Sequence, residues 1–395
     1  MKLVRAFLPL ALILNSFLPA FAGGTDSFGL DLFKQLSKEK PGENLLMSPY
    51  SISTALTMTL NGAGGKTKEA MIDVLKLGKP DLKAIDEEAR AVRSSLASSG
   101  GGVILEVANA LFARKEISFN KEFLEDNKKY FDASTKSVDF KSKEALGIIN
   151  GWVSEKTHGK IPTIIDNIPR DAILYLINAI YFKGTWEHQF KKSATTDGDF
   201  KLASGKTRAV KMMRAHRDDY PYLENEKFQA INLYYKNRDK SLYLFLPREG
   251  SNGLEKFEAD LSASSLQGFF ESFRVREGSL AMPRFKLEDR RKLKSSLSAL
   301  GMAIAFDPDR ADFKKMASID ENILIDEVFH KTFMEVNEEG TEAAAVTAVQ
   351  MARATAMMNP VQPFKMVLDR PFFFVLRDNK TGTVLFLGHV MDPGS

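Results

Sequence analysis

Cysteine does not occur among the 395 residues of this chain. Its absence excludes disulfide bonds, thiolate nucleophiles and metal sites with cysteine ligands. A chain of this length without disulfide bonds must take its stability from a large hydrophobic core. We therefore expect a sizeable folded protein that carries out no thiol or redox chemistry.

A strong excess of one charge is also missing. The chain has 55 Lys and Arg against 51 Asp and Glu, which gives a formal net charge of +4 at pH 7. Lys2 and Arg5 supply two of these charges and lie in an N-terminal segment without acidic residues, so residues 23–395 carry only +2. This excess is too small to indicate nucleic-acid binding.

Long uninterrupted hydrophobic runs are absent as well. The most apolar segment, residues 6–22, reads AFLPLALILNSFLPAFA and is broken by Pro9, Asn15 and Pro19. It is too short and too interrupted to be a good membrane span. The protein is therefore expected to be soluble and to make no use of a membrane.

The same N-terminal segment has the order of a secretory signal peptide. Lys2 and Arg5 give a positive start, the apolar stretch follows, and Ala20 and Ala22 are the small residues that a cleavage site requires. We expect residues 1–22 to be the signal peptide. The mature chain, from Gly23 onward, is then secreted and extracellular.

No Pro/Gly/Ser-rich linker, block of like charges or internal repeat divides the remainder of the sequence. Residues 23–395 are therefore expected to form a single domain. Apart from a strand at 102–113, helical patterns dominate up to residue 157, and strand patterns take over from about residue 174. Because helices come first and strands later, with little alternation between the two along the chain, we predict an α+β fold built on antiparallel sheets.

Motifs of common enzymes and metal sites are lacking. The five histidines are scattered, and none forms an HExxH pair or another metal-ligand spacing. GAGGKT at residues 62–67 resembles a phosphate-binding loop, but Leu60 stands where that motif needs its first glycine. No GxSxG nucleophile elbow occurs. We therefore expect no metal and no cofactor, and do not expect an enzyme.

Six segments resemble the motifs of one protein family, in the family's order and over nearly all of the mature chain. They are NLLMSPYSISTALTMTLNGAGGKTKEAM (44–71), NAIYFKGTWEHQF (178–190), MPRFKLE (282–288), LGMAIAFDPDRADFKKM (300–316), VFHKTFMEVNEEGTEAAA (328–345) and DRPFFFVLRDNKTGTVLFLGHV (369–390). The family is the serpins, which are serine-protease inhibitors. Within it, the chain looks most similar to secreted arthropod serpins of the tick-saliva type.

The resemblance implies the serpin fold: N-terminal helices, a large central mixed sheet, further antiparallel sheets and an exposed reactive loop. It also implies a monomeric, suicide-type inhibitor whose loop is cut by a target protease that stays attached as an acyl-enzyme. The cut loop then enters the main sheet as an extra strand. Some serpins have lost inhibition and act as carriers, so a non-inhibitory binding protein is the alternative.

The resemblance places the loop's hinge in VNEEGTEAAA, where Gly340 tolerates backbone angles closed to other residues. Strand side chains alternate between two faces, and we take Thr341, exposed before cleavage, as the first inward residue. The implied hinge comprises Glu338, Glu339, Gly340, Thr341, Glu342, Ala343, Ala344 and Ala345. The inward residues, expected beneath a covering helix, are Thr341, Ala343, Ala345, Thr347, Val349 and Met351. None is charged, which suits burial during insertion.

Five further residues match positions where the family's main sheet opens. Ser48, Ser51, Asn178 and His330 resemble a polar cluster under the sheet centre, in which each member must be hydrogen-bonded. Trp186 resembles the aromatic residue at the end where the sheet opens. Taken alone, His330 and Trp186 would be ordinary core residues.

The scissile bond has two candidate registers. The family's usual count of fourteen residues after Gly340 gives Ala354–Thr355, a bond suited to an elastase-like protease. Arg353–Ala354 lies one residue earlier and would suit a trypsin-like protease, whose specificity pocket binds arginine through a carboxylate. The count slightly favours Ala354, and Arg353 is then a solvated loop charge.

Two surface features remain open. Residues 284–297 carry six basic side chains interleaved with two acids, which fits a solvated face better than a glycosaminoglycan site but leaves heparin as an option. Asn379-Lys380-Thr381 is a glycosylation sequon in an expected exposed turn. The turn by itself already explains the asparagine.

Overall fold

The computed structural model describes residues 20–78, 81–97, 102–250, 253–319, 321–341 and 362–394. Most helices lie in the N-terminal part of the chain. The α-helices of these residues are α1 (Ala20–Glu39), α2 (Pro49–Leu60), α3 (Gly65–Val74), α4 (Leu82–Ala97), α5 (Lys121–Phe131), α6 (Ala145–Lys156), α7 (Gly253–Asp260), α8 (Ala263–Ser272) and α9 (Lys294–Leu297).

The strands form two sheets. The six-stranded sheet has the order β10 (Phe285–Lys292), β11 (Glu327–Val336), β12 (Gly340–Thr341), β4 (Leu174–Thr185), β2 (Val103–Arg114) and β3 (Ser134–Val138). The nine-stranded sheet has the order β1 (Leu45–Met47), β15 (Val384–Val390), β14 (Phe372–Asp378), β8 (Lys240–Pro247), β7 (Phe228–Tyr234), β6 (Thr207–Glu224), β9 (Arg274–Pro283) and β13 (Phe364–Val367), with β5 (Thr196–Lys201) beside β6. The α+β fold expected from the sequence is confirmed.

Parallel and antiparallel pairs mix in the six-stranded sheet. β11 runs parallel to β4, whereas β10 and β2 run antiparallel to these two strands. In the other sheet the pairing of β9 with β13 is parallel and the rest is antiparallel. The central mixed sheet is therefore as the resemblance implied, and its parallel β4–β11 seam becomes the site described below.

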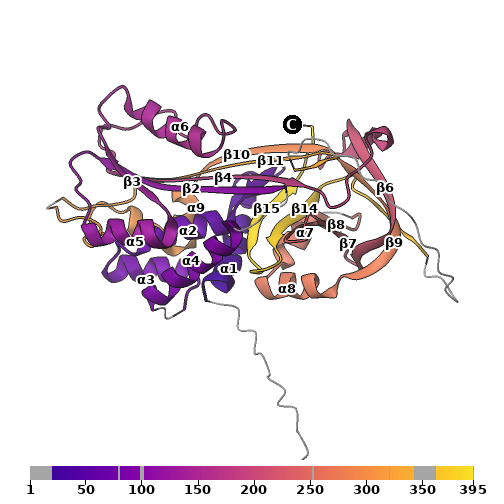
Figure 1. Ribbon diagram of the computed structural model, residues 1–395, viewed down its shortest axis with the longest axis horizontal. Helices are drawn as coiled ribbons and strands as arrows, with labels where there is room; N and C mark the ends of the chain where they lie inside the picture. Colours follow the sequence, from indigo (N-terminus) through magenta and orange to yellow (C-terminus); the bar gives the residue numbers. More distant parts are fainter. Residues whose placement is uncertain are drawn as a thin grey trace, which may run out of the picture.

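The two faces of the six-stranded sheet pack against different layers. Figure 1 shows α6 on one face and the other N-terminal helices on the opposite face. Because side chains alternate along a strand, β4 serves both layers. Leu176, Ile180 and Phe182 join the main core, while Ile177 and Tyr181 join a second core beneath α6.

Helix α2 places its first turn under the middle of this sheet. Ser48 is its N-cap, and the Ser48 side chain accepts a hydrogen bond from the Ser51 backbone N–H at 3.1 Å. Pro49 occupies the first helical turn, where its missing N–H costs nothing. Every residue of α2 is buried, so its polar groups must find partners inside the protein.

Helices α7 and α8 interrupt the strand-rich half of the chain, which the sequence interpretation did not anticipate. A capping signal for α8 was nevertheless visible. The Ser262 side chain accepts from the Ser265 N–H, and the Ser265 side chain accepts from the Ser262 N–H. Both helices are short, so neither shows a hydrophobic periodicity clear enough to identify it in a strand-rich part of the sequence.

The expected signal-peptide boundary falls inside α1, which begins at Ala20. Phe21 is fully buried, and the backbone N–H groups of Phe21 and Ala22 both donate to the Glu88 side chain, at 2.9 and 3.1 Å. Among the described residues no helix is long and apolar enough to cross a membrane. Cleavage after Ala22 stays a prediction.

Asp86 is a buried carboxyl group on the inner face of α4. It is 4% exposed, and its oxygens accept hydrogen bonds from Asn61 Nδ2 at 3.1 and 3.0 Å. Burial raises the pKa of Asp86 to about 7, opposed by the Asn61 hydrogen bonds and reinforced by the charge of Asp126. The folded chain then holds a proton that the unfolded chain releases at about pH 4, so this group lowers stability as the pH rises from about 4 to 7.

Replacement of this carboxyl group should therefore have a pH-dependent effect. Asp86→Asn should stabilise the fold at pH 8 by on the order of 2 kcal/mol and change little at about pH 3.5, where the carboxyl is mostly protonated in both the folded and the unfolded chain. Thermal unfolding at both pH values measures this difference. Asp73→Asn, on the exposed side of α3, is the control. Equal stabilisation at both pH values would contradict the burial explanation.

Candidate functional site at the parallel seam

The seam between β4 and β11 brings together most of the described candidate residues. The two strands pair in parallel from Tyr175–Glu327 to Tyr181–Phe333. A polar cluster lies at the middle of the seam, and the hinge lies at one end, where the short strand β12 separates the strands. Each part is described in turn from its contacts.

A hydrogen bond between His330 of β11 and Asn178 of β4 crosses the seam directly. His330 Nε2 accepts from the Ser48 backbone N–H at 3.1 Å. The proton of the neutral ring therefore sits on Nδ1, which donates to Asn178 Oδ1. Ser48, Asn178 and His330 are all fully buried. Helix α2, through its N-cap, thus orients the histidine that joins the two strands.

Asn178 ties the cluster to the neighbouring elements. Its Nδ2 donates to the Ser51 carbonyl oxygen at 3.0 Å and to Asn109 Oδ1 at 2.6 Å. The structure therefore assembles Ser48, Ser51, Asn178 and His330 as the sequence predicted, although their part in sheet opening stays a prediction. Asn109 of β2 was missed. The signal was available, because an asparagine in the middle of the apolar strand EVANALF needs a buried partner.

Burial also decides the charge of His330. Desolvation and, to a lesser extent, the charge of Arg291 lower the pKa of His330 to about 3. Arg291 lies on β10 and is paired with Asp289, with 2.6 Å between Nε and Oδ1. His330 is therefore neutral near pH 7, as its acceptor role toward Ser48 requires.

The hinge starts as a tight turn, Asn337–Gly340, that reverses the chain after β11. The Asn337 N–H donates to the Gly340 carbonyl oxygen at 2.8 Å, and the Glu339 N–H donates to Asn337 Oδ1 at 3.0 Å. Trp186, the residue that directly follows β4, contacts the same turn. Its indole N–H donates to the Asn337 carbonyl oxygen at 2.9 Å, and its backbone N–H donates to the Glu339 carbonyl oxygen at 3.0 Å.

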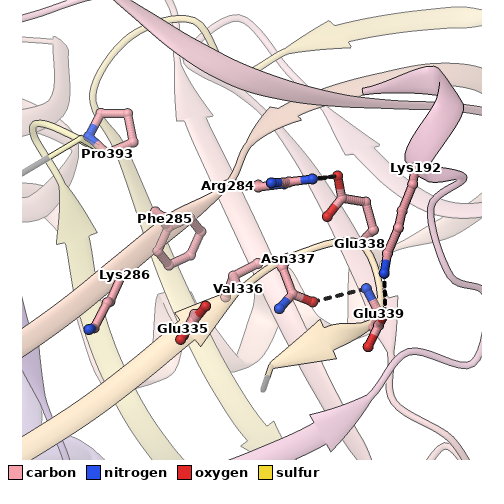
Figure 2. Close-up of a pocket in the computed structure, with 10 residues that line it drawn as sticks. All are labelled: Lys192, Arg284, Phe285, Lys286, Glu335, Val336, Asn337, Glu338, Glu339 and Pro393. Carbon is pink, nitrogen blue, oxygen red and sulfur yellow. Dashed lines mark hydrogen bonds and ion pairs between the residues drawn. The ribbon is translucent and has the colours of Figure 1, made fainter. Parts of the chain in front are cut away.

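Both glutamates of this turn are paired with basic residues at the rim of an open hollow of about 450 Å³. Figure 2 shows Arg284 donating to Glu338 and Lys192 meeting Glu339; the distances are 2.9 Å and 2.6 Å. Burial alone would raise the pKa of Glu338, but hydrogen bonds from Arg284 and Thr195 outweigh it and hold the pKa below its usual range. The ionised Glu338 carboxylate thus tethers the turn.

The hinge does not start outside the sheet, as the sequence interpretation assumed. Gly340 and Thr341 form β12, which pairs with Thr185 and Gly184 of β4 and with Val336 of β11. Thr341 is fully buried rather than exposed. The expectation failed because β12 fills the space where β4 and β11 part, inside the sheet, a long-range pairing that local sequence does not reveal.

The face assigned to the inward residues also needs correction. Thr341 lies opposite Val336, which belongs to the main core, whereas Phe333 on the other face packs beneath α6. Thr341 therefore points into the main core, away from the covering helix. Strand alternation could not tell which layer covers that face, and the other residues assigned to it lie outside the described residues.

Known proteins share this sequence and architecture. A sequence model of the family described as Serpin (serine protease inhibitor) matches residues 24–393. The chain belongs to the serpin family. The leukocyte elastase inhibitor of Sus scrofa is 37% identical over 376 residues, covering 93% of this chain and 97% of that protein. Serpin B10 of Homo sapiens is 34% identical over 401 residues, covering 95% and 100%.

Solved serpin structures superpose closely on this chain. Tengpin, a thermophilic serpin in its native state, has a TM-score of 0.85 at 30% identity, and 94% of each chain is covered. Human thyroxine-binding globulin complexed with thyroxine has a TM-score of 0.86 at 27% identity, covering 96% of this chain and 100% of that one. The expected serpin fold is confirmed. None of the relatives named here is an arthropod protein, so the likeness to tick-saliva serpins stays a prediction.

The rest of the serpin reactive loop lies outside the described residues. This applies to the hinge residues Glu342, Ala343, Ala344 and Ala345 and to both scissile-bond registers, at Arg353, Ala354 and Thr355.

Asn379, the asparagine of the glycosylation sequon, is described and half-buried. Its Nδ2, the atom that would carry a glycan, donates to the Arg238 carbonyl oxygen at 2.7 Å and to Ser241 Oγ at 2.8 Å. Glycosylation stays a prediction.

The basic residues of 284–297 do not all face one surface. Arg284 pairs with Glu338 and Arg290 with Asp166, while Arg291 is buried. Lys286, Lys292 and Lys294 lie over aromatic rings, at 5.3, 5.8 and 5.8 Å from the ring centres. Three of the six charges are thus already engaged with carboxylates. Glycosaminoglycan binding by this serpin stays a prediction.

The neutral state of His330 predicts a pH dependence. Its folded pKa lies below the ordinary value, so its contribution to stability is complete above about pH 6.5 and is lost as the pH falls toward 3. Stability should therefore decline between pH 7 and pH 5 in denaturant titrations. His330→Gln, which keeps a donor and an acceptor but does not titrate, should show a shallower decline. His216→Gln at the exposed His216 is the control; equal slopes in parent and His330→Gln would refute the assignment.

Gly340 offers a second test of the seated hinge. Its φ is +149°, and a Cβ placed there would lie 2.0 Å from the Gly184 carbonyl oxygen. Gly340→Ala should therefore push β12 out of the sheet and accelerate hydrogen exchange at residues 337–341 by about tenfold or more. Gly268→Ala, where a Cβ meets no atom, is the control. Unchanged exchange in Gly340→Ala would contradict the described docking.

Proposed function

We propose that this serpin is a secreted, suicide-type inhibitor of extracellular serine proteases that traps the acyl-enzyme by inserting its cleaved loop between β4 and β11. One observation carries the proposal: β12 already lies between β4 and β11 at one end of their seam, hydrogen-bonded to both strands. The loop continues directly from β12. Insertion would therefore extend a strand that the folded chain has started.

The chemistry of the seam supports a favourable insertion. A strand that continues β12 would run antiparallel to both β4 and β11, which now form a parallel pair. One parallel ladder would be replaced by two antiparallel ladders, and antiparallel pairing is slightly more stable per residue. Roughly a dozen added hydrogen bonds at about 1 kcal/mol each give a driving force on the order of 10 kcal/mol.

The register of β12 supports the same route. Thr341 lies opposite Gly184 and Val336. If the strand were continued in this register, residue 347 would arrive between Asn178 and His330, which insertion must separate. Residue 347 is a threonine, and its hydroxyl can both donate and accept. It would therefore replace the hydrogen bond that is lost.

The target class follows from the scissile bond. The named relatives include leukocyte elastase inhibitors, which supports a protease-inhibitor role for this chain and fits the Ala354–Thr355 register. Arg353–Ala354 would select a trypsin-like protease instead.

Secretion rests on the N-terminal 22 residues. Loss of Phe21 on cleavage would remove one buried side chain from the start of α1, a change the mature fold must accommodate.

A covalent complex tests the inhibitory mechanism and reads the register. The purified protein is mixed with a trypsin-like or an elastase-like protease and run on a denaturing gel, where acyl trapping gives a band near the sum of both masses. The released C-terminal peptide is then sequenced. A first residue of Thr355 means cleavage after Ala354, which we expect, and a first residue of Ala354 means that Arg353 was recognised.

Thermal unfolding of the cleaved chain provides the control for this test. Insertion should raise the melting temperature well above that of the uncut chain, because the loop becomes a central strand. Complete loop cleavage by both proteases, with no covalent band and no gain in melting temperature, would instead support a non-inhibitory binding serpin.

A further inference from the structure

Tyr235 lies directly beneath the seated hinge, although no sequence motif pointed to it. It follows β7 and is fully buried, and its hydroxyl shares a hydrogen bond of 2.7 Å with Thr341 Oγ1. Trp186 stacks on its ring at 4.5 Å and Phe182 meets the ring edge-on at 5.0 Å. Burial raises the pKa of Tyr235, so the hydroxyl keeps its proton and stays available for this bond.

Two glycines shape the space around this pair. A Cβ on Gly184 would lie 2.5 Å from Tyr235 Cδ1, so only glycine lets the ring fit under β4. A Cβ on Gly340 would collide with the Gly184 carbonyl oxygen, so only glycine lets the hinge backbone come this close. Gly184, Tyr235 and Gly340 therefore form a fitted slot in which the Tyr235 hydroxyl is hydrogen-bonded to Thr341.

We propose that Tyr235 is a positioning residue for loop insertion: its hydroxyl seats Thr341 and sets the register in which the rest of the loop follows. This inference rests on the inhibitory function proposed above. Because strand side chains alternate with a period of two, a slip by one residue would turn Glu342 toward the main core in place of Thr341. A carboxylate there would be buried at high cost. The Tyr235 hydroxyl therefore favours the one register that keeps charge out of the core.

A double-mutant cycle separates this role from simple core packing. Tyr235→Phe removes the hydroxyl but keeps the ring, and Thr341→Val removes the partner hydroxyl at nearly constant shape. Each single variant leaves one buried hydroxyl unpartnered, whereas the double variant leaves none. Tyr130→Phe is the matched control, since Tyr130 is a buried tyrosine of α5 whose hydroxyl accepts from Lys129 Nζ at 2.6 Å.

Three readouts are taken on the full-length mature chain: the stoichiometry of inhibition against trypsin and elastase, hydrogen exchange at residues 337–341, and the melting temperature. Tyr235→Phe and Thr341→Val should each raise hinge exchange and the stoichiometry of inhibition about fivefold, the factor expected for one buried hydrogen bond. The double variant should be no worse than either single variant. Thr341→Ser, which keeps a hydroxyl, should show a smaller increase than Thr341→Val.

Several outcomes would overturn the positioning role. Tyr235→Phe could match the parent in hinge exchange and stoichiometry, the two single effects could add in the double variant, or Tyr130→Phe could raise the stoichiometry equally. If the parent forms no covalent complex with either protease, the proposed inhibitory function fails. Hydrogen exchange then decides the seating of Thr341 by itself, with unchanged exchange in Tyr235→Phe ruling it out.

Discussion

The parallel pairing of β4 and β11 is the constraint on which the site depends. The two strands are hydrogen-bonded along most of their shared length but are parted at one end by β12. Each strand is also held from outside by an antiparallel neighbour, β2 or β10, so separating them would not unravel the sheet. Under the proposed function, this seam would accept one more strand, and the residues around it would set how firmly it stays closed.

On the face toward α2, the middle of the seam is closed by a polar network. His330 and Asn178 bond across it, and Ser48 and Asn109 satisfy their remaining groups. Such a network is stable only when every buried member is satisfied. Partial opening would leave several hydrogen-bonding groups unpaired at once, and under the proposed function an inserted strand would have to supply new partners for them.

The end of the seam is held by contacts of unequal strength. The Lys192–Glu339 pair lies at the surface, with Lys192 67% exposed, and such pairs contribute little to stability. The Thr341–Tyr235 bond is buried and its loss would leave a hydroxyl without a partner. The Lys192–Glu339 pair can therefore shift with little loss of free energy, whereas the buried contacts of Thr341 and Glu338 hold the turn more firmly.

The sequence alone determined the fold class and the members of the polar cluster quoted in its motifs. These depend on local pattern and on a family resemblance that runs along the whole chain. Only the tertiary structure decided that Thr341 is already buried, that its face belongs to the main core, and that Asn109 and Tyr235 complete the site. Tyr235 and Thr341 are 106 residues apart, and Asn109 and Asn178 are 69 apart. Contacts over such separations are set by how sheets and helices pack, and no periodicity within one segment encodes them.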